Sequence, residues 1–437
     1  MKLFRSVVFI TVCCLLLAAG AQDNQSSIPF RTAIELALKN SAASGIATAD
    51  LQRARAGYTR SRDLFLPQAV VGSGLAYTNG FPLSLEGSAP AVFNVNVQEF
   101  LFNPAQYQYI KEAKTAIHEA ESQNDSRRND VIMETALCYI QLDVVESTLA
   151  IEKEQQEMTA RLTDIVSQRM QAGLDSQVEM TRARLADTRT RLLLGQAQSA
   201  ADQLRQRLSQ LTGLPASDIH TSTESIPQFP AISQNDDLGR QAAENNPLVK
   251  VAEQAAESKE FHAKAEKRQL YPTVDLVAQY AVLARYNNYD QFFNKNTFQR
   301  NNLTIGAVIR VPIFNLAQRA AASAALADAD KAKKEARNIK EQVSGETLKL
   351  QRSVRDLAAA REVSKLEHQL SQSDIETAHA RIESGAATLK DEQSAKIAAQ
   401  QRYTAYLDSS FQVDKAQVQL LRQTGELENW ALGPAKK

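Results

Sequence analysis

Two long stretches of the sequence contain no proline, and they restrict the possible folds more than any other feature. One stretch lies between Pro104 and Pro215 and the other between Pro312 and Pro434. A proline inside a helix removes a backbone hydrogen bond and costs about 3 kcal/mol. Both stretches are also rich in Ala, Gln, Leu, Glu, Arg and Lys, which favour helices. The sequence therefore predicts very long helices in both stretches.

Each stretch has one clear interruption, and the two interruptions match. The first reads RMQAGLDSQVEMTRA from Arg169, and the second reads RIESGAATLKDEQSA from Arg381. Gly173 and Gly385 hold the same place in the two segments, so the copies are related by a constant offset in residue number. We interpret the chain as an internal duplication in which each copy contains one long α-hairpin.

Upstream segments repeat as well. FNPAQ at residues 102–106 matches FNLAQ at residues 314–318, again at an offset of 212. Further upstream, FLP ending at Pro67 matches LYP ending at Pro272, at an offset of 205. Insertions and deletions are best tolerated in exposed loops. We therefore expect an exposed loop between the FLP or LYP motif and the FN motif of each copy.

These upstream intervals alternate apolar and polar residues. One apolar set in the second copy is Val274, Leu276, Ala278, Tyr280 and Val282, and the next is Leu303, Ile305, Ala307, Ile309 and Val311. The first copy shows the same alternation, for example in VFNVNVQ. Each run has about 10 residues, the length with which a tilted strand crosses a bilayer. A half-buried sheet in a soluble protein would alternate in the same way.

Aromatic residues favour the membrane interpretation of these strands. Of 27 aromatic residues in the chain, 14 fall within residues 65–102 and 271–314, as in the aromatic girdles of membrane barrels. Four strands cannot close a membrane barrel, which needs about eight. Open strand edges in lipid would leave backbone groups unpaired at several kcal/mol each. The strands therefore predict a homo-oligomer whose copies share one barrel.

The N-terminus has the pattern of a secretory signal peptide. A basic start with Lys2 and Arg5 precedes the apolar residues 7–18 and an A-x-A motif at 19–21, so we expect cleavage after Ala21. The apolar run is shorter than the roughly 20 residues of a membrane-spanning helix. Cys14 lacks the context of a lipid attachment site. The protein is predicted to be exported.

Nothing in the sequence indicates catalysis. Its five histidines have no metal-ligand spacing, and it contains no nucleophile elbow, P-loop or dinucleotide fingerprint. Lys plus Arg and Asp plus Glu balance at 50 each, which gives no basic field for nucleic acid. After signal cleavage only Cys138 remains of three cysteines, in an apolar helical run. We predict no enzyme activity, no catalytic residues, no cofactor and no metal site.

The expected domain organisation follows the duplication. The signal peptide covers 1–21, the first repeat 22–214, an irregular insertion 215–237, the second repeat 238–428 and a tail 429–437. The first repeat has strands at about 66–78 and 92–102 and long helices at 103–172 and 174–212. The second has strands at about 272–284 and 302–314 and helices at 315–384 and 386–428. Single helices over 32–64 and 238–269 precede the strands.

With these repeated motifs, the sequence resembles the TolC-type outer-membrane efflux proteins across essentially the whole mature chain. The resemblance implies a fold that is mainly α with membrane β. Three protomers would form a 12-stranded β-barrel continuous with a 12-helix α-barrel. Such proteins lie in the outer membrane, contact its lipid and extend into the periplasm. They serve as exit ducts coupled to an inner-membrane transporter through a periplasmic adaptor.

The resemblance also assigns candidate site residues. The turns with Arg169, Gly173, Arg381 and Gly385 would form the periplasmic tip that the adaptor contacts. Asp391 matches an aspartate that lines the tip constriction in some members, whereas Ser394 stands where those members have a second aspartate. A purely local role remains an alternative, because glycine supplies a turn with φ > 0 and arginine stabilises a helix C-terminus.

The FN motifs would be strand–helix junctions. Phe102, Asn103, Phe314 and Asn315 are the candidate junction residues, and Pro104 suits the first turn of a helix. Many relatives have F-D/N-G-G at these strand ends, so this chain departs from their pattern. The predicted function is a passive efflux channel for small molecules. Type I protein secretion and a soluble periplasmic coiled-coil scaffold are the alternatives.

Overall fold

The computed structural model describes residues 27–74, 91–230, 237–284, 299–386 and 389–433. The predicted signal peptide and most of both inter-strand loops lie outside these ranges. The chain divides into two compact units. We call Gly45–Arg127 with Gly239–Gly345 the sheet unit, and Met1–Ser44 with Arg128–Leu238 and Glu346–Lys437 the turn unit. Each unit therefore combines segments from both copies of the duplication.

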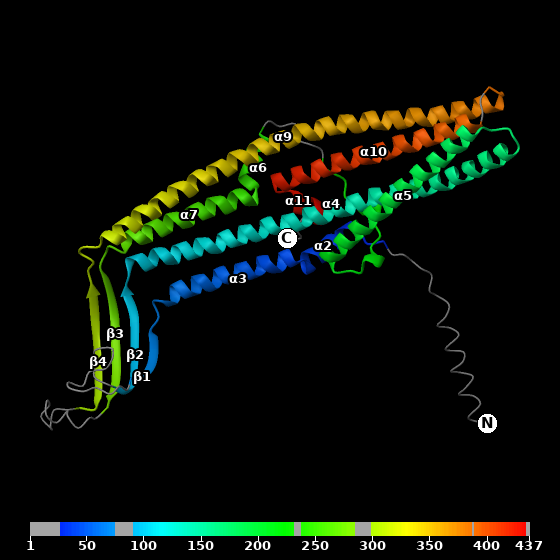
Figure 1. The fold of residues 1–437 in the computed structure, drawn as a ribbon. Coiled ribbons are helices and arrows are strands. Elements are labelled where there is room, and N and C mark those ends of the chain that lie inside the picture. Colours follow the sequence, from blue (N-terminus) through cyan, green and yellow to red (C-terminus); the bar gives the residue numbers. More distant parts are fainter. Residues whose placement is uncertain (1–26, 75–90, 231–236, 285–298, 387–388, 434–437) are drawn as a thin grey trace, which may run out of the picture. The chain divides into compact units, whose positions relative to one another are not determined.

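The sheet unit contains one antiparallel sheet of four strands (Figure 1). The strands are β1 (Gln68–Gly74), β2 (Ala91–Phe102), β3 (Thr273–Leu283) and β4 (Asn301–Arg310), and they lie in the order β1-β2-β3-β4. The pairing of β2 with β3 joins the two copies of the duplication into one sheet. Strand β4 ends before Pro312, which has no N–H to donate to a ladder.

The register gives the sheet one apolar and one polar face. Val97 of β2 pairs with Ala278 of β3, which pairs with Ile305 of β4, and directly paired residues point to the same side. The adjacent positions Asn96, Gln279 and Thr304 therefore share the opposite side. Ile305 is 66% exposed. The alternation predicted from the sequence is present over most of β2, β3 and β4, whereas in β1 Val70 lies beside Asn96 on the polar side.

The long helices of the two copies have equal lengths. Helices α4 (Pro104–Gln171) and α9 (Leu316–Glu383) have 68 residues each, and α5 (Gln177–Thr212) and α10 (Leu389–Thr424) have 36 each. The starts of each pair differ by the same offset of 212 that relates the two copies in the sequence. This correspondence confirms the predicted fold class, an internally duplicated β-hairpin joined to a long α-hairpin.

The helices that precede the strands are interrupted, which corrects the expectation of single helices. α2 (Phe30–Asn40) and α3 (Ala42–Asp63) are separated at Ser41, and α6 (Leu238–Asn245) and α7 (Pro247–Arg268) at Asn246. A residue before proline is disfavoured in the helical region, so Pro247 ends α6. The Asn246 side chain then accepts a hydrogen bond from Leu248 N at 2.9 Å and starts α7 as its N-cap.

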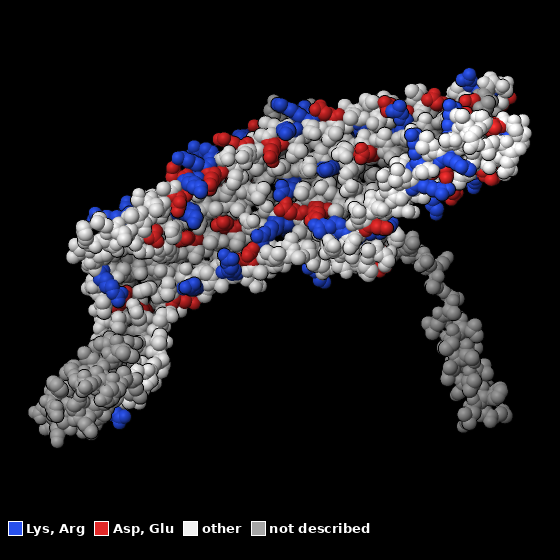
Figure 2. Space-filling view, viewed as in Figure 1, with Lys and Arg blue, Asp and Glu red and all other residues white. Residues whose placement is uncertain are grey.

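The core of the turn unit lies around α2, α4 and the short helix α11 (Leu427–Leu432). Its fully buried members include Phe30, Ile34, Ile132 and Leu427. The Phe30 ring meets Tyr139 edge-on, with 5.4 Å between the ring centroids. Two short 3-10 turns, η1 (Ala216–Asp218) and η2 (Thr223–Ser225), follow α5. Basic and acidic side chains are interspersed on the helices visible in Figure 2.

Candidate functional site: strand–helix joints and helical turns

The two FN motifs form the same joint at the starts of α4 and α9. Asn103 Oδ1 accepts a hydrogen bond from Gln106 N at 3.0 Å, and Asn315 Oδ1 accepts one from Gln318 N at 3.0 Å. A side-chain oxygen that accepts from a backbone N–H of the first turn is the N-cap interaction. Each asparagine thus stabilises the start of a 68-residue helix. Asn103 directly follows β2, whereas Asn315 lies five residues after the end of β4.

The glutamines of the same motifs connect each joint to the preceding helix. Gln106 Nε2 donates to Ser61 O at 2.7 Å, and Gln318 Nε2 donates to Glu266 O at 2.9 Å. Ser61 and Glu266 lie in the last turns of α3 and α7, where carbonyls lack intrahelical partners. Sequence reasoning missed this role. The signal was the spacing of Asn and Gln, which is that of a capping box.

The aromatic junction residues are exposed. Phe102 is 47% exposed and lies at the end of β2, whereas Phe314 is 79% exposed and lies between β4 and α9. In the first copy, Phe65 stacks on Tyr107 of α4 with 4.8 Å between the ring centroids. The sheet unit therefore presents aromatic side chains near the place where strands continue into helices.

The turns after α4 and α9 have one backbone structure. Gly173 and Gly385 both have φ +73°. Leu174 N donates to Arg169 O at 2.9 Å, and Ala386 N donates to Arg381 O at 2.7 Å. This six-to-one hydrogen bond with a left-handed glycine is the Schellman motif that ends helices. No atom lies within 4 Å of a Cβ built on either glycine, so the backbone conformation alone requires glycine there.

The two turns differ in their side chains. Arg169 Nε donates to Asp175 Oδ2 at 2.9 Å, and this hydrogen bond and the charge of Asp175 raise the pKa of Arg169. In the second copy, Ala387 stands at the position that corresponds to Asp175. Arg381 has no ion-pair partner among the described residues. Sequence comparison of the turns paired the arginines but missed this difference.

The predicted constriction residue lies just beyond the second turn. Asp391 is in the first turn of α10 with Glu392, where negative charge is favoured by the helix dipole. The Glu392 carboxylate accepts a hydrogen bond from Lys396 Nζ, which lowers the pKa of Glu392. In the first copy, Ser176 is the N-cap of α5 and accepts from Glu179 N at 3.3 Å. The structure thus brings each arginine together with its glycine, and Asp391 follows the second pair.

The described residues show neither a metal site nor a membrane-spanning helix. They contain no group of three or more His, Cys, Asp or Glu side chains that could hold a metal ion. None of the helices in the described ranges is long and apolar enough to cross a membrane.

The chain combines one four-stranded antiparallel sheet with two long α-hairpins. The family model described as outer membrane efflux protein matches residues 33–214 and 238–426, and the chain belongs to this family. Its members are transport conduits of the outer membrane and not enzymes. The chain is therefore an outer-membrane protein, and the alternative of a soluble periplasmic scaffold is not retained.

Two proteins of known name are similar to this chain in sequence. Protein CyaE of Bordetella pertussis is 25% identical over 301 residues, which cover 67% of this chain and 62% of that protein. The cobalt-zinc-cadmium resistance protein CzcC of Cupriavidus metallidurans is 25% identical over 213 residues, covering 48% of this chain and 46% of CzcC. The chain thus spans less than two thirds of the length of either relative.

A solved structure has the same fold. The CmeC outer membrane channel of Campylobacter jejuni matches with a TM-score of 0.74 and 15% identity, over 94% of this chain and 91% of CmeC. At this identity the likeness concerns the fold alone.

Proposed function

We propose that this protein is a trimeric exit channel, a passive conduit for small molecules that works with a periplasmic adaptor and an inner-membrane transporter. The observation that carries the proposal is the sheet. It has one exposed apolar face, and β1 and β4 are its edge strands in the described chain. In lipid, the backbone N–H and C=O groups along a strand edge need hydrogen-bond partners from another strand. Three copies would supply twelve strands for one closed barrel that continues into twelve helices.

The direct test is planar-bilayer conductance of the purified protein, together with its mass in detergent. We expect discrete channels and a mass of three chains. Conductance requires no energy source, because the proposed channel is passive. A monomeric mass, or a preparation of folded trimers that carries no current, would refute the proposal.

We propose efflux of small solutes ahead of protein secretion. The relative CzcC is a cobalt-zinc-cadmium resistance protein, which supports export of small solutes by this chain. A deletion strain should become more sensitive to small toxic compounds and regain resistance with the wild-type chain. Loss of a protein from the culture medium with unchanged sensitivity would favour type I secretion instead.

The two helical turns are the proposed adaptor contacts, and Asp391 the proposed constriction residue. Gly173 and Gly385 have φ +73°. The proline ring holds φ in the negative region and does not permit this conformation. Gly173→Pro or Gly385→Pro should therefore distort a turn, leave barrel assembly intact and impair export. Gly195→Ala, in the middle of α5 with open space around it, is the matched control. Normal resistance in both proline variants would count against adaptor contact at the turns.

A further inference from the structure

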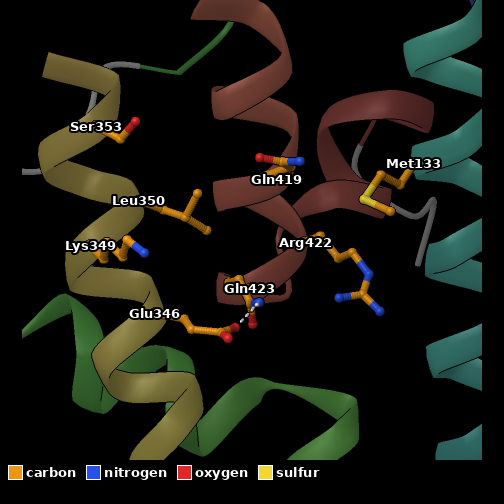
Figure 3. A pocket seen from close by; sticks show the side chains of 8 residues that line it. All are labelled: Met133, Glu346, Lys349, Leu350, Ser353, Gln419, Arg422 and Gln423. Carbon is orange, nitrogen blue, oxygen red and sulfur yellow. Dashed lines mark hydrogen bonds between the residues drawn. The ribbon is translucent and has the colours of Figure 1, made fainter. Parts of the chain in front are cut away.

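A pocket of about 390 Å³ opens between three helices of the turn unit, and Figure 3 shows the side chains around it. We call it the three-helix pocket. Its lining residues are Met133 of α4, Glu346, Lys349, Leu350 and Ser353 of α9, and Gln419, Arg422 and Gln423 of α10. Pockets of roughly 300–1,000 Å³ are of the size that binds small organic molecules. Conduction and adaptor contact do not account for this pocket.

In the first copy, the glutamate that corresponds to Glu346 is neutralised by an arginine. At the same offset of 212, Glu346 corresponds to Glu134 and Gln419 to Arg207. Arg207 Nε donates to Glu134 Oε1 at 2.7 Å. In the second copy the arginine is replaced by an uncharged amide. The Glu346 carboxylate instead accepts from Gln423 Nε2 at 3.3 Å, the dashed line in Figure 3.

The first copy also fills this place with apolar side chains. Leu211, which corresponds to Gln423, is 6% exposed and packs with Ala37 and Val131. Leu137, which corresponds to Lys349, packs against the main core. The second copy thus has polar side chains where the first has two leucines, and the pocket lies among them.

The charges around the pocket are not all balanced locally. Arg422 points toward α4 and its Nε donates to Asp130 Oδ1 at 2.8 Å, so its charge is already paired. Glu346 and Lys349 are three residues apart on α9, yet no ion pair joins them in the described chain. On the same helix, Glu362 and Lys365 at this spacing are 3.7 Å apart. The pocket therefore presents separate negative and positive groups about one helical turn apart.

Between the charged groups the pocket has an apolar surface. Leu350 points into the pocket from α9 and packs against the cluster of Val354, Ala416 and Leu420. Met133 lies on the α4 side and packs against the main core of the turn unit. A bound molecule would thus contact apolar side chains beside two opposite charges.

We propose that the three-helix pocket binds an amphipathic zwitterion of the amino-acid type, with an ammonium and a carboxylate on one carbon and an apolar body. The ammonium pairs with Glu346 and the carboxylate with Lys349, and the apolar body lies on Leu350 and Met133. This ligand site is additional to the proposed channel function and does not depend on it, since binding is measured without transport.

The test uses the full-length protein in detergent and three probes with the same indole body. Tryptophan is a zwitterion, tryptamine a cation and indole-3-propionate an anion. Exposed ion pairs of this kind contribute about two- to fivefold in affinity each. Ligand-observed NMR should therefore give tryptophan a Kd about two- to fivefold below that of either other probe. Equal affinities, or no binding to the assembled protein because a second copy covers the pocket, would overturn the proposal.

Variants locate the binding. Glu346→Gln should remove the difference in Kd between tryptophan and indole-3-propionate, because Glu346 pairs with the ammonium that tryptophan has and indole-3-propionate lacks. Lys349→Gln should remove the difference in Kd between tryptophan and tryptamine, because Lys349 pairs with the carboxylate. The pair Gln419→Arg and Gln423→Leu, which restores the first-copy residues, should abolish binding of all three probes. Glu362→Gln, the same charge change on α9 away from the pocket, is the matched control. If tryptophan binds equally well to Glu346→Gln, to the double variant Gln419→Arg/Gln423→Leu and to the wild type, the site lies elsewhere.

Discussion

Tyr139 holds three segments of the turn unit together through one hydroxyl. Its Oη donates to Ile28 O at 2.6 Å and accepts from Ser222 N at 2.8 Å, and Ser225 Oγ lies 3.1 Å away. The side chain is 1% exposed. Residues before α2, the middle of α4 and the segment after α5 therefore depend on the same buried group.

Tyr139→Phe should destabilise the protein by about 1–3 kcal/mol, because it leaves buried hydrogen-bonding groups unpaired while preserving the ring. Chemical unfolding followed by circular dichroism measures the change. Tyr406→Phe is the control, since the Tyr406 hydroxyl makes no hydrogen bond within the described residues. Equal stabilities of the two variants would contradict the assigned role.

Asp414 of α10 is a buried carboxyl that makes stability depend on pH. Burial raises the pKa of Asp414 from 3.8 to about 6, although the nearby charge of Arg361 opposes the shift. A raised pKa means that the folded state holds the proton more tightly than the unfolded state. The folded protein therefore loses stability as the pH rises from about 4 through about 6.

Asp414→Asn should accordingly raise stability at pH 7, by at most about 3 kcal/mol because each pKa unit corresponds to about 1.4 kcal/mol. The gain should shrink as the pH falls and vanish below about pH 4, where both side chains are neutral. Melting temperatures of the two proteins from pH 4 to pH 8 test this expectation. A gain that stays constant over that range would show that ionisation is not its cause.

At the scale of elements, the joint between strand and helix makes the same hydrogen bonds in both copies. The asparagine caps the new helix at 3.0 Å in both copies, and the glutamine reaches the last turn of the preceding helix. A cap satisfies backbone N–H groups that otherwise have no partner in the helix. The same five-residue motif therefore starts each long helix and connects it to the helix before the strands.

Asn103→Ala and Asn315→Ala should each cost about 1 kcal/mol, the typical effect of losing an N-cap. The double variant should lose about the sum, since the two caps share no partner. Unfolding free energies of the single and double variants provide the measurement. Asn124→Ala, inside α4 and away from its start, should be neutral or slightly stabilising because alanine favours helices. A destabilisation there equal to that of the caps would rule out the capping explanation.

At the scale of the whole molecule, the two copies share helix lengths but differ in the ion pairs that join their long helices. Arg205 pairs with Glu146 at 2.7 Å across α4 and α5, and Arg402 pairs with Glu367 at 2.8 Å across α9 and α10. The residues that correspond to the first pair are Gln417 and Ala358, and those that correspond to the second are Thr190 and Gln155. Neither ion pair has a counterpart in the other copy. The two long helices of each hairpin therefore fit each other through contacts that the other hairpin lacks.

A chimera in which residues 177–212 replace residues 389–424 should therefore assemble poorly, although the two helices have the same length. It would lose the Arg402–Glu367 pair and place Arg205 opposite Ala358. The fraction of the proposed trimer that survives heating in a detergent gel measures the effect. As a control, residues 389–424 re-inserted through the same junctions should behave as wild type. A chimera as heat-stable as wild type would show that the helices are interchangeable.

Local patterns determined much of this protein by themselves. Proline-free stretches determined two very long helices, alternation determined the strand faces, and glycines at equal offsets determined where the helices turn. Each of these signals lies within a short stretch of sequence, because a helix, a strand or a turn depends on neighbouring dihedral angles and side chains. For the same reason Pro247 determined the break after α6, which the expectation of a single helix over 238–269 overlooked.

Contacts between distant residues were decided only by the tertiary structure. The pairing of β2 with β3, the reach of Gln106 to Ser61 and the pocket beside Glu346 all depend on how separate segments are aligned. Two copies with the same local signals can differ in such contacts, because a side chain's partners depend on packing register as well as on its own position in the chain.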